Sequence, residues 1–170
     1  MQRQEGFTLI ELVTVLVILG VIAALALPSF EGMIQSQRVR TASESVLNGL
    51  QLARAEAIRR NARARFVIAA TGSGWTVELD DGTDIQVRPG GEGSSNVTVA
   101  RTPVNATTVT FNSLGQIVAN ADASATLTQV DLDISGTSRE LRVVIGTGGL
   151  IRMCDPSTYL NAGDPRRCDT

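Results

Sequence analysis

An uncharged apolar run near the N-terminus constrains this chain more than any other feature. It reads FTLIELVTVLVILGVIAALALPSF over residues 7–30; no charged residue occurs from Leu12 to Leu27, and Pro28 closes the run. A helix from Phe7 to Leu27 would be roughly 31 Å long at about 1.5 Å per residue, which matches the ~30 Å hydrocarbon core of a bilayer. The sequence therefore predicts a membrane-resident helix over residues 7–28.

A short polar leader, MQRQEG, precedes the apolar run. A secretory signal carries its cleavage site after the apolar region, at small residues, whereas the small residue Gly6 stands before it. Cleavage after Gly6 would remove residues 1–6 and retain the apolar helix. Arg3 favours the cytoplasmic side for the leader, as the positive-inside rule requires.

Glu11 is the only charged residue inside the apolar segment. An unpaired carboxylate in that environment costs several kcal/mol or must be neutralised, so it needs a partner. One explanation is a capping box, because Thr8 and Glu11 stand three residues apart at the expected start of the helix. The other is that Glu11 pairs with a positive group of a second copy of the same segment.

The text GFTLIELV, followed by the apolar run and Pro28, resembles the class III signal of type IV pilins and type II secretion pseudopilins. The resemblance implies that a prepilin peptidase cleaves between Gly6 and Phe7, and that the new amine of Phe7 is methylated. Glu11 would then meet the N-terminal amine of a neighbouring subunit, which supplies a partner for the buried carboxylate. It further implies a single-pass protein of the bacterial inner membrane with a periplasmic head, found in a pilus after assembly.

Residues 29–62 predict a second, amphipathic half of the helix. Apolar residues recur there every three or four positions, which is typical of a helix face that packs on a core: Val39, Ala42, Val46, Leu50, Ala53 and Ala57. The opposite face, which includes Arg54 and Glu56, is expected to face solvent or neighbours. We expect the helix to end near Asn61 and to bend at Pro28.

Residues 63–153 predict a β-rich head of short strands separated by glycine and aspartate turns. The expected strands are 66–70, 75–79, 85–88, 96–101, 108–111, 126–134 and 140–145. The texts LQLARAEAIRRNARARFVIA, FNSLGQIV and VVIGTGGLIRMC are similar to the FimT and GspH type of minor pilins and pseudopilins. The expected fold is therefore α+β and pilin-like, with a long N-terminal helix packed on an antiparallel β-rich head.

Composition argues against catalysis. The chain has no histidine, a formal net charge of −2 and no G-x-S-x-G motif, so we expect no enzyme, no cofactor and no metal site. The arginine-rich text ARAEAIRRNARAR is spread around the helix by its geometry. We interpret it as a solvated helix face and not as a track for nucleic-acid phosphates.

Cys154 and Cys168 lie downstream of the export segment and predict a disulfide that closes the C-terminal loop, residues 154–170. Closing a loop of about fifteen residues stabilises a fold by about 3 kcal/mol in the chain-entropy model. The loop would hold Tyr159, Arg166 and Arg167 at the surface.

Some FimT-type pilins bind DNA through a glycine-arginine-any-arginine motif near the C-terminus. The corresponding text here is Gly149-Leu150-Ile151-Arg152, in which Leu150 replaces the first arginine. Arg152 together with Arg166 and Arg167 would form a small cationic patch for DNA phosphates.

These observations together predict a minor pilin that takes part in type IV pilus assembly. Its expected partners are a prepilin peptidase, other pilin or pseudopilin subunits and the inner membrane. The alternatives are a GspH-like pseudopilin of a type II secretion system and a DNA-binding pilin for natural transformation.

Overall fold

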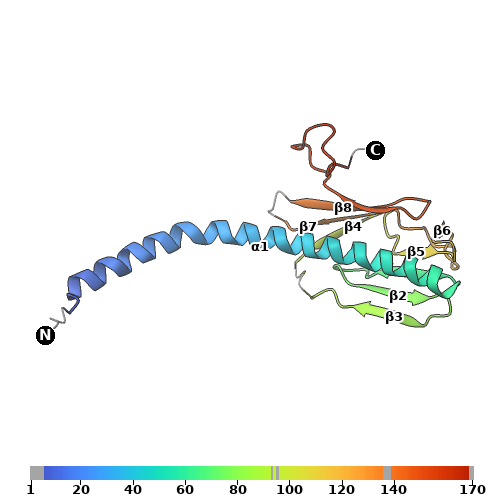
Figure 1. Ribbon diagram of the computed structural model, residues 1–170, viewed down its shortest axis with the longest axis horizontal. Coiled ribbons are helices and arrows are strands. Elements are labelled where there is room, and N and C mark those ends of the chain that lie inside the picture. The colour runs from blue at the N-terminus through green and yellow to red at the C-terminus, as the bar shows by residue number, and fades with distance from the viewer. Residues whose placement is uncertain (1–5, 93, 95, 136–138, 169–170) are drawn as a thin grey trace. The chain divides into compact units, whose positions relative to one another are not determined.

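The computed structural model describes residues 6–92, 94, 96–135 and 139–168. The rest of the leader, Arg3 included, lies outside the described residues. The chain divides into two compact units, Met1–Gln35 and Ser36–Thr170, which we call the stem and the head. Helix α1 (Leu9–Arg60) contributes residues to both units (Figure 1).

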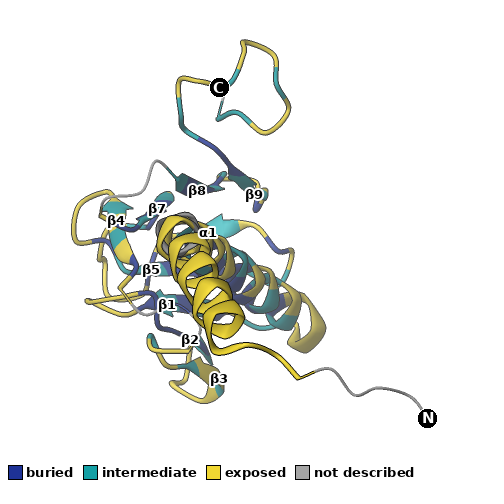
Figure 2. Ribbon diagram, turned by 90° about the vertical axis from the view of Figure 1, so that its left-hand side faces the viewer, coloured by how far each residue is buried: buried dark blue, intermediate teal, exposed yellow. Residues whose placement is uncertain are grey.

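The stem is an apolar helix whose side chains contact little else. Every large apolar residue from Phe7 to Leu25 is exposed, as the yellow part of α1 in Figure 2 shows. Among the described residues, no single helix meets the length and hydropathy criteria for a membrane span; Leu9–Leu25 and Phe30–Arg60 meet them only together, as a bent pair. The helical backbone continues through Pro28, where the sequence predicts a bend.

The part of α1 in the head packs through the predicted apolar stripe. All of its members are completely buried, which confirms the helix face expected from the periodicity: Val39, Ala42, Val46, Leu50, Ala53 and Ala57. The helix ends where expected, because Asn61 adopts a left-handed φ of 50°. The Asn61 N–H donates to the carbonyl of Ile58 at 3.2 Å. The N–H of the following residue, Ala62, donates to the carbonyl of Ala57 at 3.1 Å. This pattern is a Schellman motif, which satisfies the last carbonyls of a helix.

The head contains two antiparallel sheets. The first has the order β3-β2-β1-β5-β6 and the second the order β4-β7-β8-β9. The first sheet comprises β1 (Ala64–Ile68), β2 (Trp75–Leu79), β3 (Asp84–Arg88), β5 (Thr108–Phe111) and β6 (Ile117–Val118). The second comprises β4 (Thr98–Thr102), β7 (Gln129–Asp133), β8 (Glu140–Ile145) and β9 (Ile151–Cys154). This arrangement confirms the expected α+β class, with antiparallel strands and a long helix.

The core of the head lies between α1 and the inner faces of the two sheets (Figure 2). Strands show the alternation of half-buried sheets: Phe66 and Ile68 of β1 and Val143 of β8 are buried, while their sequence neighbours are only partly covered. Trp75 is 5% exposed, and its indole N–H donates to the hydroxyl of Ser45 at 2.8 Å. The core therefore fixes the helix against both sheets.

Gly49 is required where the helix meets two aromatic rings. A Cβ at this position would lie 2.7 Å from a Phe66 ring carbon and 2.9 Å from two Trp75 ring atoms. The Phe66 and Trp75 ring centroids are 5.8 Å apart. The missing side chain lets both rings pack directly on the helix backbone, which outweighs the poor helix propensity of glycine.

Two hairpin turns, one from each sheet, meet beside the helix. The turn between β5 and β6 contains Gly115, and the turn between β8 and β9 contains Gly149. A Cβ on Gly149 would lie only 2.0 Å from the carbonyl oxygen of Gly115, and that oxygen accepts a 3.0 Å hydrogen bond from Nε of Arg54. We call this contact of Arg54, Gly115 and Gly149 the turn junction. It corrects the prediction that Arg54 faces solvent.

Each of the seven expected strand regions contains a strand, but most of the ends are shifted. The expected strand 66–70 begins earlier, at Ala64, and the expected strand 126–134 shortens to Gln129–Asp133, with Thr126 forming an isolated bridge to Thr108. Strands β6 and β9 were not predicted as separate strands. Both are short and flank glycine turns, so their periodicity is too brief to detect.

Three arginines of the arginine-rich segment bind carboxylates close to them. Arg59 and Arg60 both bind Glu56, with N–O distances of 2.6 and 2.7 Å. Arg65 faces Glu78 across β1 and β2 at 2.5 Å. The side chains of Arg59 and Arg60 are 64% and 38% exposed, as the interpretation of a solvated helix face predicts.

A Glu56→Gln variant is expected to lose stability at neutral pH but not in acid. Hydrogen bonds from Arg59 and then Arg60 lower the pKa of Glu56 from 4.5 to about 2. Because the pKa falls on folding, the stabilisation is complete above the usual value and is lost as the pH approaches 2. We expect a loss of about 1 kcal/mol at neutral pH, since solvent screens a surface cluster.

Denaturation of wild type and of the Glu56→Gln variant, at neutral pH and near pH 2, measures the difference in their free energies of unfolding. Glu44→Gln is the matched control, because Glu44 binds one arginine among the described residues, Arg40 at 2.8 Å, and its side chain is 46% exposed. A Glu56 effect that persists unchanged in acid would contradict the prediction.

Candidate functional site

The expected processing site lies at the start of the stem. Gly6 and Phe7 are both exposed, and Phe7 is 86% accessible. Helix α1 begins two residues later, at Leu9, so the Gly6–Phe7 bond lies in non-helical backbone. A peptidase needs an accessible bond, and the residues on both sides of this one are exposed.

Thr8 and Glu11 form a capping box. Thr8 precedes the first helical residue, and its hydroxyl accepts from the Glu11 N–H at 3.3 Å. The Glu11 carboxylate accepts in return from the Thr8 N–H at 3.4 Å. The capping explanation of Glu11 is therefore present within one chain. It does not compete with an intermolecular role, because a carboxylate has four lone-pair sites and the box occupies few of them.

An apolar hollow adjoins this carboxylate. Its volume is about 290 Å³, and Phe7, Leu12, Val15 and Leu16 line it together with Glu11. A carboxylate at the edge of such a hollow would be desolvated by anything apolar that covered it, and would then need a positive partner.

The C-terminal loop is closed by the predicted disulfide between Cys154 and Cys168, whose Cα atoms are 5.1 Å apart. Backbone bonds reinforce it: the Asp155 N–H donates to the Arg166 carbonyl at 2.7 Å, and the Cys168 N–H donates to the Asp155 carbonyl at 3.0 Å. The loop is thus tied to the end of β9 through both backbone and side chains.

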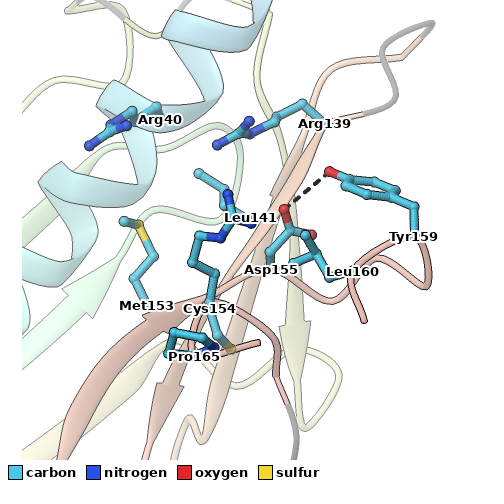
Figure 3. A pocket seen from close by; sticks show the side chains of 10 residues that line it. Arg40, Arg139, Leu141, Met153, Cys154, Asp155, Tyr159, Leu160 and Pro165 are labelled. Carbon is cyan, nitrogen blue, oxygen red and sulfur yellow. Dashed lines mark hydrogen bonds between the residues drawn. The ribbon is translucent and has the colours of Figure 1, made fainter. Parts of the chain in front are cut away.

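Three arginines distant in sequence converge on a cavity of about 300 Å³ at this loop (Figure 3). Arg40 comes from α1, Arg139 immediately precedes β8, and Arg166 comes from the C-terminal loop. The apolar part of the lining includes Leu141 and Met153. We call this the arginine cavity.

Asp155 anchors one wall of the arginine cavity. Its carboxylate accepts hydrogen bonds from the N–H of Ser157 at 2.9 Å, from the Ser157 hydroxyl and from the Tyr159 hydroxyl at 3.1 Å. Burial acts to raise the pKa of Asp155, but these hydrogen bonds outweigh it and the pKa is lowered. The carboxylate is therefore ionised and fully occupied in holding the loop.

The structure gives each arginine of the predicted DNA patch its own local setting. Arg152 pairs in register with Val144 and is not among the residues that line the arginine cavity, whereas Arg166 is. Arg166 binds Asp164 through two bonds of 3.0 and 2.7 Å, which raises its pKa. Arg167 donates to the carbonyl of Leu160 at 3.3 Å. DNA binding by these residues stays a prediction.

The arginine cavity has no signal in the sequence. Arg40, Arg139 and Arg166 belong to three different parts of the chain, and each resembles an ordinary surface arginine in sequence. Only the pairing of β8 with β9 and the closure of the C-terminal loop bring them together. A local motif could not have identified them.

Comparison with known proteins identifies two family features. The family described as type II transport protein GspH matches residues 42–149. The prokaryotic N-terminal methylation motif matches residues 1–27. Together they leave residues 28–41 and 150–170 unmatched, so β9 and the C-terminal loop lie outside both matches.

Individual relatives agree with this assignment. The type IV major alpha-pilin and fimbrial protein Q, both of Moraxella bovis, are each 49% identical to the chain over 45 residues, or 26% of its length. The chain spans only 28% and 29% of the lengths of these two proteins.

Solved structures extend the likeness to the head. Two crystal structures of the type IV minor pilin FimU of Pseudomonas aeruginosa PAO1 superpose with TM-scores of 0.55 and 0.53, at 17% and 18% identity. They cover 68% and 67% of this chain, and 87% and 90% of the FimU chains. At this identity the likeness shows a shared fold. The chain therefore belongs to the GspH family, and its methylation motif and pilin-like fold make it a member of the type IV minor pilins and pseudopilins.

Proposed function

We propose that the protein is a minor pilin, processed by a prepilin peptidase and assembled from the bacterial inner membrane into a type IV pilus. One observation carries the proposal. The stem is an exposed apolar helix in which Glu11 is the only charged residue between Phe7 and Phe30, and the methylation motif matches this same segment.

The exposed stem needs an apolar environment both before and after assembly. An apolar surface of this extent does not stay in water, so it resides in lipid or is covered by protein. Because burial is worth roughly 25 cal/mol per Å² in either environment, transfer from the bilayer to a bundle of similar stems costs little. The pilin is thus stored in the membrane and moved into the filament with its apolar surface covered throughout.

Glu11 is proposed to select the position of each new subunit. In lipid its carboxylate is costly, and pairing with the methylated amine of Phe7 on a neighbour removes that cost. The apolar hollow beside Glu11, lined by Leu12 and Val15, favours this pairing because it would exclude water once a second stem covers it. The head takes no part in this step.

Processing can be tested by intact-mass measurement of the protein purified from membranes of a host that has the peptidase. We expect the loss of residues 1–6 and the gain of one methyl group on Phe7. A Gly6→Val variant should keep its leader, because the bulkier side chain replaces the small residue before the cleaved bond. A wild-type mass that retains the leader, in cells that process other pilins, would exclude this proposal.

A type II secretion pseudopilin is the second candidate, and the match to the family described as type II transport protein GspH favours it. Both candidates use the stem in the same way and differ in where the filament is found. Sheared surface filaments that contain the protein support the pilus. Its absence from them, together with failure to secrete proteins when it is deleted, supports the secretion system.

A further inference from the structure

We propose that two copies of this chain contact one another in the filament through two different surfaces. One surface is an apolar patch around the turn junction of the head, and the other is a helix face on the stem, at residues 30–34. The inference rests on the proposed function, because it needs a filament. It adds which part of one subunit meets which part of the next.

The first surface surrounds the turn junction. Ile58 of α1, Leu114 of the β5–β6 turn and Leu150, which ends the β8–β9 turn, are 49%, 73% and 68% exposed. They are neighbours, because Cδ1 of Ile58 lies 2.8 Å from the position of a Cβ on Gly115, and Gly115 contacts Gly149. Figure 1 shows both turns at the end of the head where α1 finishes. We call the following residues the junction patch: Arg54, Ile58, Leu114 and Leu150.

The backbone of the junction patch is fixed before any partner binds. The carboxamide oxygen of Asn112 accepts hydrogen bonds from the N–H groups of Leu114 at 3.0 Å and Gln116 at 2.9 Å. The Ile117 N–H donates to the carbonyl of Thr147 at 3.3 Å, which ties one turn to the other. Apolar side chains on a backbone that is already ordered lose little entropy when a partner covers them.

The second surface lies on the stem. Phe30, Met33 and Ile34 are 60%, 62% and 51% exposed. Their spacing of i, i+3 and i+4 places them on one side of α1, as in helices that dock on apolar surfaces. The run from Phe7 to Leu27 already matches the thickness of the hydrocarbon core, so lipid leaves this side uncovered and a protein surface is needed. We call the following residues the stem face: Phe30, Glu31, Met33 and Ile34.

The two surfaces carry single charges of opposite sign. The stem face has the exposed carboxylate of Glu31, and the junction patch has the guanidinium of Arg54. Arg54 uses Nε for the Gly115 carbonyl at 3.0 Å, and its terminal nitrogens carry further N–H donors. Within the described part of the chain, neither Arg54 nor Glu31 takes part in an ion pair. A contact between them at the edge of the apolar residues would fix the register of the two subunits.

A second copy of the chain supplies the complementary surface, and the two surfaces differ. A contact between different surfaces of identical subunits is heterologous, and where its rotation does not close a ring it repeats into an open helical array. A filament requires such an array. Pairing at Glu11 joins stem to stem, and this contact would join the stem of one subunit to the head of another.

The test is cysteine cross-linking in sheared filaments from cells that express two differently tagged copies of the full chain. One copy carries Ile34→Cys and the other Leu114→Cys, and a short bismaleimide joins thiols that lie close together. We expect a cross-linked dimer that carries both tags, and the same from Met33→Cys with Leu150→Cys. The matched control pairs Ile34→Cys with Val104→Cys, because Val104 is apolar, 82% exposed and outside the junction patch. It should give no dimer.

The charge contact is tested in the same filaments. Glu31→Gln in the Ile34→Cys copy should lower the dimer yield about twofold to fivefold, the worth of a partly exposed ion pair. Glu31→Arg should lower it further, because it brings a like charge to Arg54. Asp84→Asn is the matched control, since it removes an exposed carboxylate of β3, and it should leave the yield unchanged.

Immunoblots of the same filaments measure incorporation separately from cross-linking. Wild type that is present in filaments whose cysteine copies give no dimer, or the same yield with Val104→Cys, would overturn the contact and leave the proposed function intact. An unchanged yield with Glu31→Arg would also overturn it. A benzophenone attached at Leu114→Cys that captured only other pilins would overturn the second copy as the partner. Absence of wild type from every filament would overturn the proposed function and this contact with it.

Discussion

A Glu11→Val variant is expected to enter the inner membrane at the wild-type level and to be nearly absent from filaments. Valine lengthens the apolar run, so insertion does not suffer. The amine of the neighbouring subunit then has no carboxylate to meet in an apolar bundle, and breaking such a pair costs about 3–5 kcal/mol. We expect incorporation below about one tenth of wild type, since each 1.4 kcal/mol is worth a factor of ten. Immunoblots of membranes and sheared filaments measure both quantities.

Two further variants separate the charge of Glu11 from its capping role. Glu11→Gln retains the capping box with Thr8, because glutamine serves equally at that position, but it lacks the charge. Thr8→Ala breaks the box and leaves the charge. We expect Glu11→Gln to fail like Glu11→Val and Thr8→Ala to assemble. The reverse result, with Thr8→Ala defective and Glu11→Gln normal, would show that Glu11 acts only through the helix start.

The stem could be predicted from sequence because its information is local. An uncharged run, a small residue before it and one carboxylate at a defined spacing are all visible in consecutive residues. The helix stripe from Val39 to Ala57 is equally local, because burial on one face leaves a period that a sequence shows directly. The buried stripe was therefore predicted residue by residue, and the helix of the stem was predicted to within two residues of its start.

The fold class of the head could be predicted from the sequence, but the order of its strands in the two sheets could not. The alternation of apolar and polar residues in β1 and β8 predicts strands. It does not predict that β1 pairs with β5 or that β4 pairs with β7. That partition into two sheets depends on long-range packing against α1. The same limit explains Arg54, which the helical wheel places on the polar face and which the turn junction then covers.

The glycine of the text Gly149-Leu150-Ile151-Arg152 illustrates how a motif and a packing constraint can coincide. In sequence Gly149 matches one position of the pattern that some FimT-type pilins use for DNA. In the structure it adopts a left-handed φ of 80° and touches the carbonyl of Gly115. Its presence is thus explained by the turn junction whether or not the head binds DNA.

A Gly149→Ala variant is expected to destabilise the head by about 3 kcal/mol, through a left-handed backbone that alanine disfavours and an overpacked contact. The new Cβ would lie 2.0 Å from the Gly115 carbonyl oxygen, a backbone atom that cannot turn aside. The two turns must then separate, which also weakens the bond from Arg54 to Gly115. For a domain of this size we expect the melting temperature to fall by about 6–12 °C.

Gly148→Ala is the matched control, one residue away in the same turn. Nothing lies within 4 Å of a Cβ at that position. Its melting temperature should therefore stay close to that of wild type, because exposed substitutions away from special backbone positions change stability by about 0.5 kcal/mol or less. Thermal unfolding of the full chain in micelles, followed by the fluorescence of Trp75, the only tryptophan, compares all three proteins. If both variants melted with wild type, the contact between Gly149 and Gly115 would contribute nothing to the stability of the head, which would contradict the prediction.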